Sequence, residues 1–128
     1  MRIARFLRDI NAAFNLDIAR QRLRAALTLA NQFQDQRVDI QVVLAGLATN
    51  ELTDALLDIT DGPVAPPLHP VAQDRIGMAK SEITSAINAF TFAGRAAHLS
   101  NAISRVENAR DQFGANLNFV LGQGNLMF

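Results

Sequence analysis

Two histidines and three regularly spaced aspartates are the strongest candidates in this sequence for metal binding or acid–base chemistry. His69 lies in a proline-rich stretch and His98 in a predicted helix, and neither has a carboxylate or a second histidine at ligand spacing along the chain. Asp54, Asp58 and Asp61 recur at i, i+4 and i+7, a spacing that could hold a hard cation but more often marks a solvated helix face. We therefore predict no metal site and expect both histidines to be solvated or structural.

Motifs for nucleophilic catalysis and phosphate binding are missing from the sequence. No glycine-rich loop follows a strand, as a phosphate-binding motif requires. Four serines lack the strand–turn–helix context of a nucleophile elbow: Ser81, Ser85, Ser100 and Ser104. The chain has no cysteine, which excludes disulfides, thiolate zinc sites and cysteine nucleophiles. We expect no enzymatic activity and no cofactor.

The bulk composition is that of one globular domain. The 128 residues are 49% hydrophobic, and residues 1–128 are predicted to form a single helical domain. Twelve basic and twelve acidic side chains balance, so nucleic acid is not an expected partner and net charge does not oppose self-association. The N-terminal stretch does not read as a secretory signal, and no segment approaches the roughly 20 apolar residues of a membrane span.

Charge is segregated along the chain although it sums to zero. Residues 1–24 hold six arginines but only two acidic residues, Asp9 and Asp17. Among residues 35–62, every charged side chain except Arg37 is acidic. The simplest interpretation is two solvated helix faces of opposite sign. The alternative is electrostatic complementarity between subunits that pack head to tail.

Helical periodicity dominates the N-terminal half. Residues 2–14 carry an apolar stripe, and the same period continues from Leu16 to about Gln36. This first stripe, a candidate face for a membrane or a partner, consists of Ile3, Phe6, Leu7, Ile10 and Phe14. Residues 37–48 fit either a strand or a helix, and we read them as helix because no second strand is available to pair with them. Asn50 is then a candidate N-cap for a short helix that ends near Ile59.

A proline-rich linker separates this half from the next. Residues 1–61 hold the N-terminal helices, 62–69 the linker, 70–121 the C-terminal helices and 122–128 a tail. Pro70 suits the first turn of a helix. Two apolar seams follow, with a break in phase around Thr91–Gly94 that predicts a turn or kink. The first seam contains Ala72, Ile76, Ala79, Ile83, Ala86 and Phe90, and the second Leu99, Ala102, Val106, Ala109, Phe113, Leu117 and Val120.

These patterns predict an all-α fold. The architecture is a four- to five-helix bundle, or extended helical hairpins with coiled-coil-like seams. The same seams would serve within one chain or between two copies, and the pattern does not choose between them.

The C-terminal helical segment carries the most specific pattern of the chain. Residues 99–118, LSNAISRVENARDQFGANLN, resemble the C-terminal helix of flagellins and of the related hook–filament junction proteins. The matching positions are Val106, Arg110, Phe113, Gly114, Ala115 and Asn118. The resemblance implies a helix packed in the coiled-coil core of a self-assembling filament, without catalytic residues.

Gly114 is unusual because it follows the bulky Phe113 inside a predicted helix, where glycine costs roughly 1 kcal/mol relative to alanine. We interpret Gly114 and Ala115 as a notch that admits another helix. The predicted packing residues are Leu99, Ala102, Val106, Ala109, Arg110, Phe113, Gly114, Ala115 and Leu117.

The expected function is that of a non-enzymatic structural protein, in a filament of flagellar type or a phage virion. Its expected partners are itself or other proteins of that assembly, and an extracellular appendage or a virion would be its location. The alternatives are a small adaptor or chaperone-like binding module, and a membrane-active protein that uses the N-terminal stripe.

Overall fold

The computed structural model describes residues 2–60 and 69–114, with the backbone alone for residues 2–6, and these residues form four helices. The helices are α1 (Arg2–Phe33), α2 (Val38–Thr60), α3 (Pro70–Ile87) and α4 (Phe92–Asp111). The described ranges contain no strand. The prediction of an all-α helical bundle is confirmed, with four helices.

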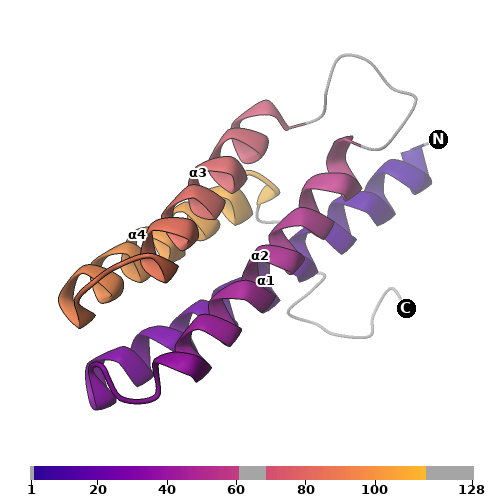
Figure 1. Ribbon diagram of the computed structural model, residues 1–128. Helices are drawn as coiled ribbons and strands as arrows, with labels where there is room; N and C mark the ends of the chain where they lie inside the picture. The colour runs from indigo at the N-terminus through magenta and orange to yellow at the C-terminus, as the bar shows by residue number, and fades with distance from the viewer. Residues whose placement is uncertain (1, 61–68, 115–128) are drawn as a thin grey trace.

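The four helices form two antiparallel hairpins, α1–α2 and α3–α4, that lie side by side (Figure 1). Helix α1 packs against α2 and α4, and α3 packs against α4 and α2. The two hairpin turns, residues 34–37 and 88–91, lie at the same end of the bundle. Every helix therefore turns one face towards a shared axis, as in up-and-down bundles.

The shared core follows a heptad repeat in which alanine fills one of the two core positions. Buried residues alternate at spacings of four and three in every helix, which is the pattern of coiled-coil packing. The buried alanines that recur at every seventh residue are Ala12, Ala19, Ala26, Ala48, Ala55, Ala72, Ala79, Ala86, Ala102 and Ala109. Two of the alternate positions also hold alanine, Ala30 and Ala45, and the others hold the larger side chains Leu16, Leu23, Leu52, Ile59, Ile76, Ile83, Leu99 and Val106. Small side chains at the contact let helix axes approach at the short end of the usual 8–10 Å range.

The helix ends follow from local chemistry. Gln34 and Arg37 have positive φ values of 51° and 56°, and they reverse the chain between α1 and α2. Pro70 occupies the first turn of α3, where its missing N–H costs nothing. Thr91 caps α4, because its hydroxyl accepts a hydrogen bond of 3.1 Å from the backbone N–H of Gly94. The predicted break around Thr91–Gly94 is therefore a helix boundary.

The structure decides two ambiguities in the N-terminal half. Residues 2–14 and the following segment form one uninterrupted helix to Phe33, and residues 38–48 are helical as predicted. The predicted cap at Asn50 is wrong, because α2 passes through this exposed residue without a break. Its neighbour Glu51 forms an ion pair with Arg22 of α1, an interaction between helices that local capping rules do not reveal.

Two predictions about the C-terminal half also need correction. Phe90 lies in the turn between α3 and α4 and is fully exposed, so the first seam ends at Ala86. Helix α4 ends at Asp111, and Gly114 is an exposed residue beyond it with φ +82°. The helix is broken at Gln112 and Phe113, directly before the glycine, and Gly114 itself is again assigned as helical. Residues with a Cβ rarely adopt this left-handed backbone conformation, which explains why glycine occupies position 114.

Gly114→Ala is expected to lower the free energy of unfolding by about 1 kcal/mol, because an L-residue is strained in this backbone conformation. Gly114→Leu should cost the same, since nothing lies within 4 Å of an added Cβ, and Gly114→Asn should cost less. Urea unfolding of the three variants measures these differences. A leucine variant far less stable than the alanine variant would favour the notch interpretation instead.

The remaining sequence predictions fall outside the described residues. They concern Asp61, the linker up to residue 68, the tail, and Ala115, Leu117, Asn118 and Val120.

Candidate functional site

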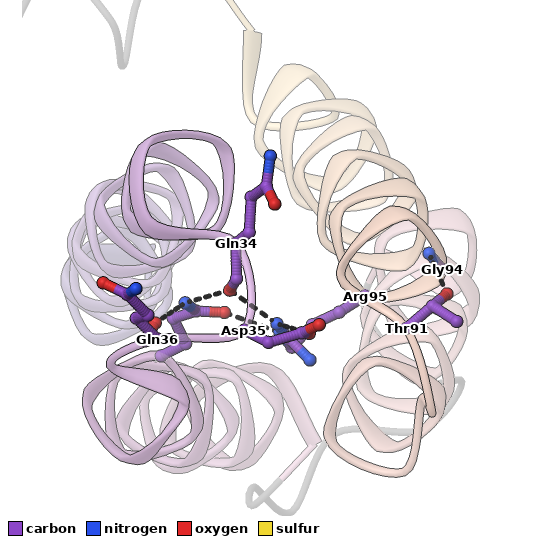
Figure 2. Close-up of polar contacts among 7 residues, drawn as sticks. Gln34, Asp35, Gln36, Thr91, Gly94 and Arg95 are labelled. Carbon is purple, nitrogen blue, oxygen red and sulfur yellow. Dashed lines mark hydrogen bonds and ion pairs between the residues drawn. The ribbon is translucent and has the colours of Figure 1, made fainter.

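A buried polar network joins the α1–α2 turn to α4 (Figure 2). The Arg95 side chain donates from Nε to Gln41 Oε1 at 2.6 Å and from Nη2 to the Gln34 carbonyl at 2.8 Å. Gln41 Nε2 donates to the carbonyls of Gln34 and Gln36, both at 3.1 Å. Arg95 also pairs with Asp35 at 3.2 Å. Although Arg95 is only 4% exposed, its charge is thus met by carbonyl and carboxylate oxygens.

The network replaces two alanines of the core repeat. Gln41 lies seven residues before Ala48, and Arg95 seven before Ala102, so each stands where its helix would otherwise place a small side chain. The partners of the network are carbonyls at the C-terminal end of α1, where the helix dipole favours positive charge. We conclude that this network caps α1 and connects the two hairpins.

Polar side chains also pair between helices along the outside of the bundle. Arg22 of α1 forms an ion pair with Glu51 of α2. This pair joins the basic segment 1–24 to the acidic segment 35–62 of the same chain. Between α1 and α4, Arg20 lies 2.7 Å from Glu107. At least part of the charge segregation therefore serves contacts inside the bundle.

Both histidines lie within hydrogen-bonding distance of a carboxylate from a distant helix. His69 Nε2 lies 3.0 Å from Asp9 Oδ1, and its ring is 4.6 Å from that of Phe113. His98 Nδ1 lies 2.8 Å from Glu82 Oε2. Sequence spacing missed these partners, because they come from α1 and α3 rather than from the histidines' own segments. Among the residues that the structure describes, no group of three or more potential ligands could hold a metal ion.

Six of the predicted packing residues of the C-terminal segment contact the rest of the same chain. Four of them are buried in the core, namely Leu99, Ala102, Val106 and Ala109. Phe113 packs beside them and also covers Ile10 and Ala13 of α1. Arg110 Nε donates to Asp17 of α1 at 3.1 Å, which fastens the end of α4 to α1. The structure thus places this seam within one subunit.

The predicted N-terminal stripe does not form a single face. Ile10 is buried, whereas Leu7 and Phe14 are 43% and 44% exposed. Ile18, one turn after Phe14, is also exposed. Ile3 and Phe6 belong to the part of α1 whose side chains are not described. The outward face of α1 accordingly runs through Leu7, Phe14 and Ile18, a different set from the one that sequence periodicity selected.

A shallow hollow of about 390 Å³ lies beside this face, between α1 and α2. Phe14 and Leu57 supply its apolar lining, and its polar lining comes from Asn11, Asn15, Asp54 and Asp58. Asn15 Nδ2 donates to Asp58 Oδ2 at 3.0 Å across the two helices. The hollow can accept an apolar side chain that is flanked by a donor or a positive charge.

Burial raises the pKa of the Asp58 carboxyl above its ordinary value, and the charge of Asp54 acts in the same direction. The hydrogen bond from Asn15 and the charge of Arg8 oppose this shift. Because the folded-state pKa exceeds the unfolded-state value, the folded protein binds the proton more tightly. Ionised Asp58 therefore lowers stability at neutral pH, and this loss is recovered as the pH falls through the folded-state pKa.

Asp58→Asn is expected to raise the free energy of unfolding at pH 7 by at most about 0.5 kcal/mol. The new side-chain oxygen can still accept the hydrogen bond from Asn15, and the gain should shrink as the pH falls. Urea unfolding across a pH series measures it, with the exposed Asp74→Asn as the matched control. A variant less stable than the parent at pH 7 would contradict the assigned direction of the shift.

Exposed apolar side chains are unevenly distributed over the described helices. Helices α1 and α2 expose seven large apolar side chains, whereas α3 exposes two, Val71 and Ile87, and the turn after it exposes Phe90; the seven are Leu7, Phe14, Ile18, Phe33, Val43, Leu47 and Leu57. Helix α4 exposes no large apolar side chain along its described length, and its outer face carries Ala93, Ala97, Ser100, Ser104 and Asn108. The outer face of the α1–α2 hairpin, which we call the α1–α2 face, is therefore the candidate interaction surface. None of the described helices is long and apolar enough to span a membrane.

Comparisons with protein families, with curated proteins and with solved structures return no match to this chain.

Proposed function

We propose that this protein is a non-enzymatic structural protein that acts by binding other protein chains in a larger assembly. The observation that carries the proposal is the α1–α2 face, which leaves apolar side chains exposed after the bundle has buried its core. Contiguous apolar patches on a protein surface mark sites of protein contact, and Phe14 and Leu57 of this face line one hollow together.

The core seams are occupied within the chain, so we assign the contact with other subunits to the outside of the bundle. We propose two assemblies that could contain such a subunit, a filament of flagellar type and a phage virion. The resemblance of residues 99–118 to flagellin C-terminal helices supports the first. A formal net charge of zero leaves self-association unopposed and is compatible with both.

Sedimentation velocity of the purified chain, from low to high micromolar concentration, tests the proposal. We expect discrete species larger than a monomer whose share grows with concentration. A chain that remains a monomer at every concentration, and that binds no other protein of its native context, would contradict the proposal.

The second candidate is an adaptor that presents the hollow between α1 and α2 to a helix of another protein. The acidic and apolar lining favours this role, since it suits an amphipathic helix with a basic flank. Sedimentation separates the two, because an adaptor would be a well-folded monomer or dimer at all concentrations and would enlarge only with its partner.

A further inference from the structure

The buried residues near the start of α1 belong to two separate clusters. Ala12 and Leu16 are part of the core that all four helices share. Ile10 and Ala13, which are 2% and 0% exposed, form a second, smaller cluster. Among the residues that the structure describes, the partly buried apolar side chain packed against this second cluster is that of Phe113. The burial of Ile10 and Ala13 therefore depends on one aromatic ring.

The segment that carries this ring lies outside the helices. Helix α4 ends at Asp111, and the exposed residues Gln112 and Gly114 flank the half-buried Phe113. The backbone N–H groups of Gln112 and Phe113 donate to carbonyls in the last turn of α4, at 3.2 and 3.1 Å. The segment 112–114 is thus bonded through its backbone to α4, whereas its apolar contact with α1 comes from the Phe113 side chain.

Contacts on either side of Phe113 hold the helices together without it. Arg110, three residues earlier, donates to Asp17 of α1 at 3.1 Å, so α4 is fastened to α1 before the segment begins. On the other side, His69 Nε2 lies 3.0 Å from Asp9 Oδ1, and the His69 ring is 4.6 Å from that of Phe113. The ring can therefore leave α1 while α3 and α4 keep their own contacts with it. Segments with few buried apolar contacts open in this local manner.

We infer that the segment 112–114 is a latch, which swings away from α1 while the four-helix core stays folded and so uncovers Ile10 and Ala13. Leu7, Ile10 and Phe14 follow one another at spacings of three and four, which place them on one side of the helix. Leu7 and Phe14 are already exposed. Opening of the latch would add Ile10 between them and make one continuous apolar surface. As a control on the size of the α1–α2 face, the latch rests on the proposed function.

Thiol labelling tests the latch without background, because the chain has no cysteine of its own. Ala13→Cys and Ala12→Cys place a thiol at neighbouring positions of α1 that are both 0% exposed, one beneath Phe113 and one in the shared core. Iodoacetamide should modify Ala13→Cys at least about a hundredfold faster, since a core thiol reacts only after global unfolding. Low urea concentrations should accelerate only Ala12→Cys, because local opening exposes little surface.

Two further substitutions separate local opening from global unfolding. Ile83→Val, in the core of α3, should accelerate the labelling of Ala12→Cys about two- to tenfold and leave that of Ala13→Cys unchanged. Phe113→Ala should accelerate the labelling of Ala13→Cys at least about tenfold, because it removes the covering ring. Ile10→Cys reports on the same cluster if circular dichroism shows that Ala13→Cys is not folded.

Equal labelling rates at positions 12 and 13, with the same response to urea and to Ile83→Val, would overturn the inference. Labelling uses the chain alone and needs no partner. That result would therefore leave the proposed function standing. A latch that opens in a chain that never associates and binds no other protein would instead contradict the proposed function and retain the latch.

Discussion

Arg95→Ala is expected to lower the free energy of unfolding by about 3 kcal/mol and the melting temperature by roughly 10 °C. The substitution removes the donors to Gln41 Oε1 and to the Gln34 carbonyl. A polar atom that loses its partner in the interior keeps the full cost of leaving water. The Arg95→Ala substitution also removes the positive charge beside the C-terminal end of α1.

The control for this experiment is Arg105→Ala, an arginine of the same helix that is less buried. Its effect should stay within about 0.5 kcal/mol. In a double-mutant cycle, Arg95→Ala combined with Gln41→Ala should cost less than the sum of the two single changes, since neither partner remains to be left unpaired. Strict additivity, or an Arg95→Ala variant as stable as the parent, would contradict the role assigned to the network.

Ala102→Leu is expected to destabilise the bundle by about 1–3 kcal/mol through overpacking. Ala102 has no exposed surface and is one of the recurring core alanines. Leucine and alanine have similar helix propensities, so the cost would arise from the packing of α4 against its neighbours.

The exposed Ala97 on the same helix offers a matched control. Ala97→Leu adds the same atoms where they meet solvent and should change stability by less than about 0.5 kcal/mol. Thermal unfolding followed by circular dichroism compares the two variants. Equal melting temperatures would show that the alanines are not needed for close approach of the helices.

The fold class and most of the core were predictable from the sequence. The seams Ala72–Ala86 and Leu99–Ala109 are buried as their spacing predicts, because apolar residues at intervals of four and three lie on one side of a helix. The errors at Asn50 and Gly114 have a common origin. In both cases the residue type was assigned the wrong place in a helix: α2 continues through Asn50, where Glu51 pairs with Arg22 of α1, and α4 ends before Gly114.

The candidate site was less predictable than the fold. Ile10 was grouped with Leu7 and Phe14 by their apolar character, but Phe113, just beyond α4, packs against Ile10, while the other two are exposed. Arg95 and Gln41 were not singled out, although each lies seven residues before a core alanine. A search for polar residues in register with an apolar seam would have found both.

The sequence by itself determined the helices, the alanine-rich heptad seams and the absence of cysteine chemistry, because these depend on residue types and on the period of a helix. Only the tertiary structure decided which seam is covered by which helix, where the buried arginine finds its acceptors and which apolar residues remain outside. These properties depend on side chains that are distant in the chain: 54 residues separate Gln41 from Arg95, and 93 separate Asp17 from Arg110. Periodicity records the direction in which a residue points along its own helix, but the neighbour that it meets is set by how the hairpins pack.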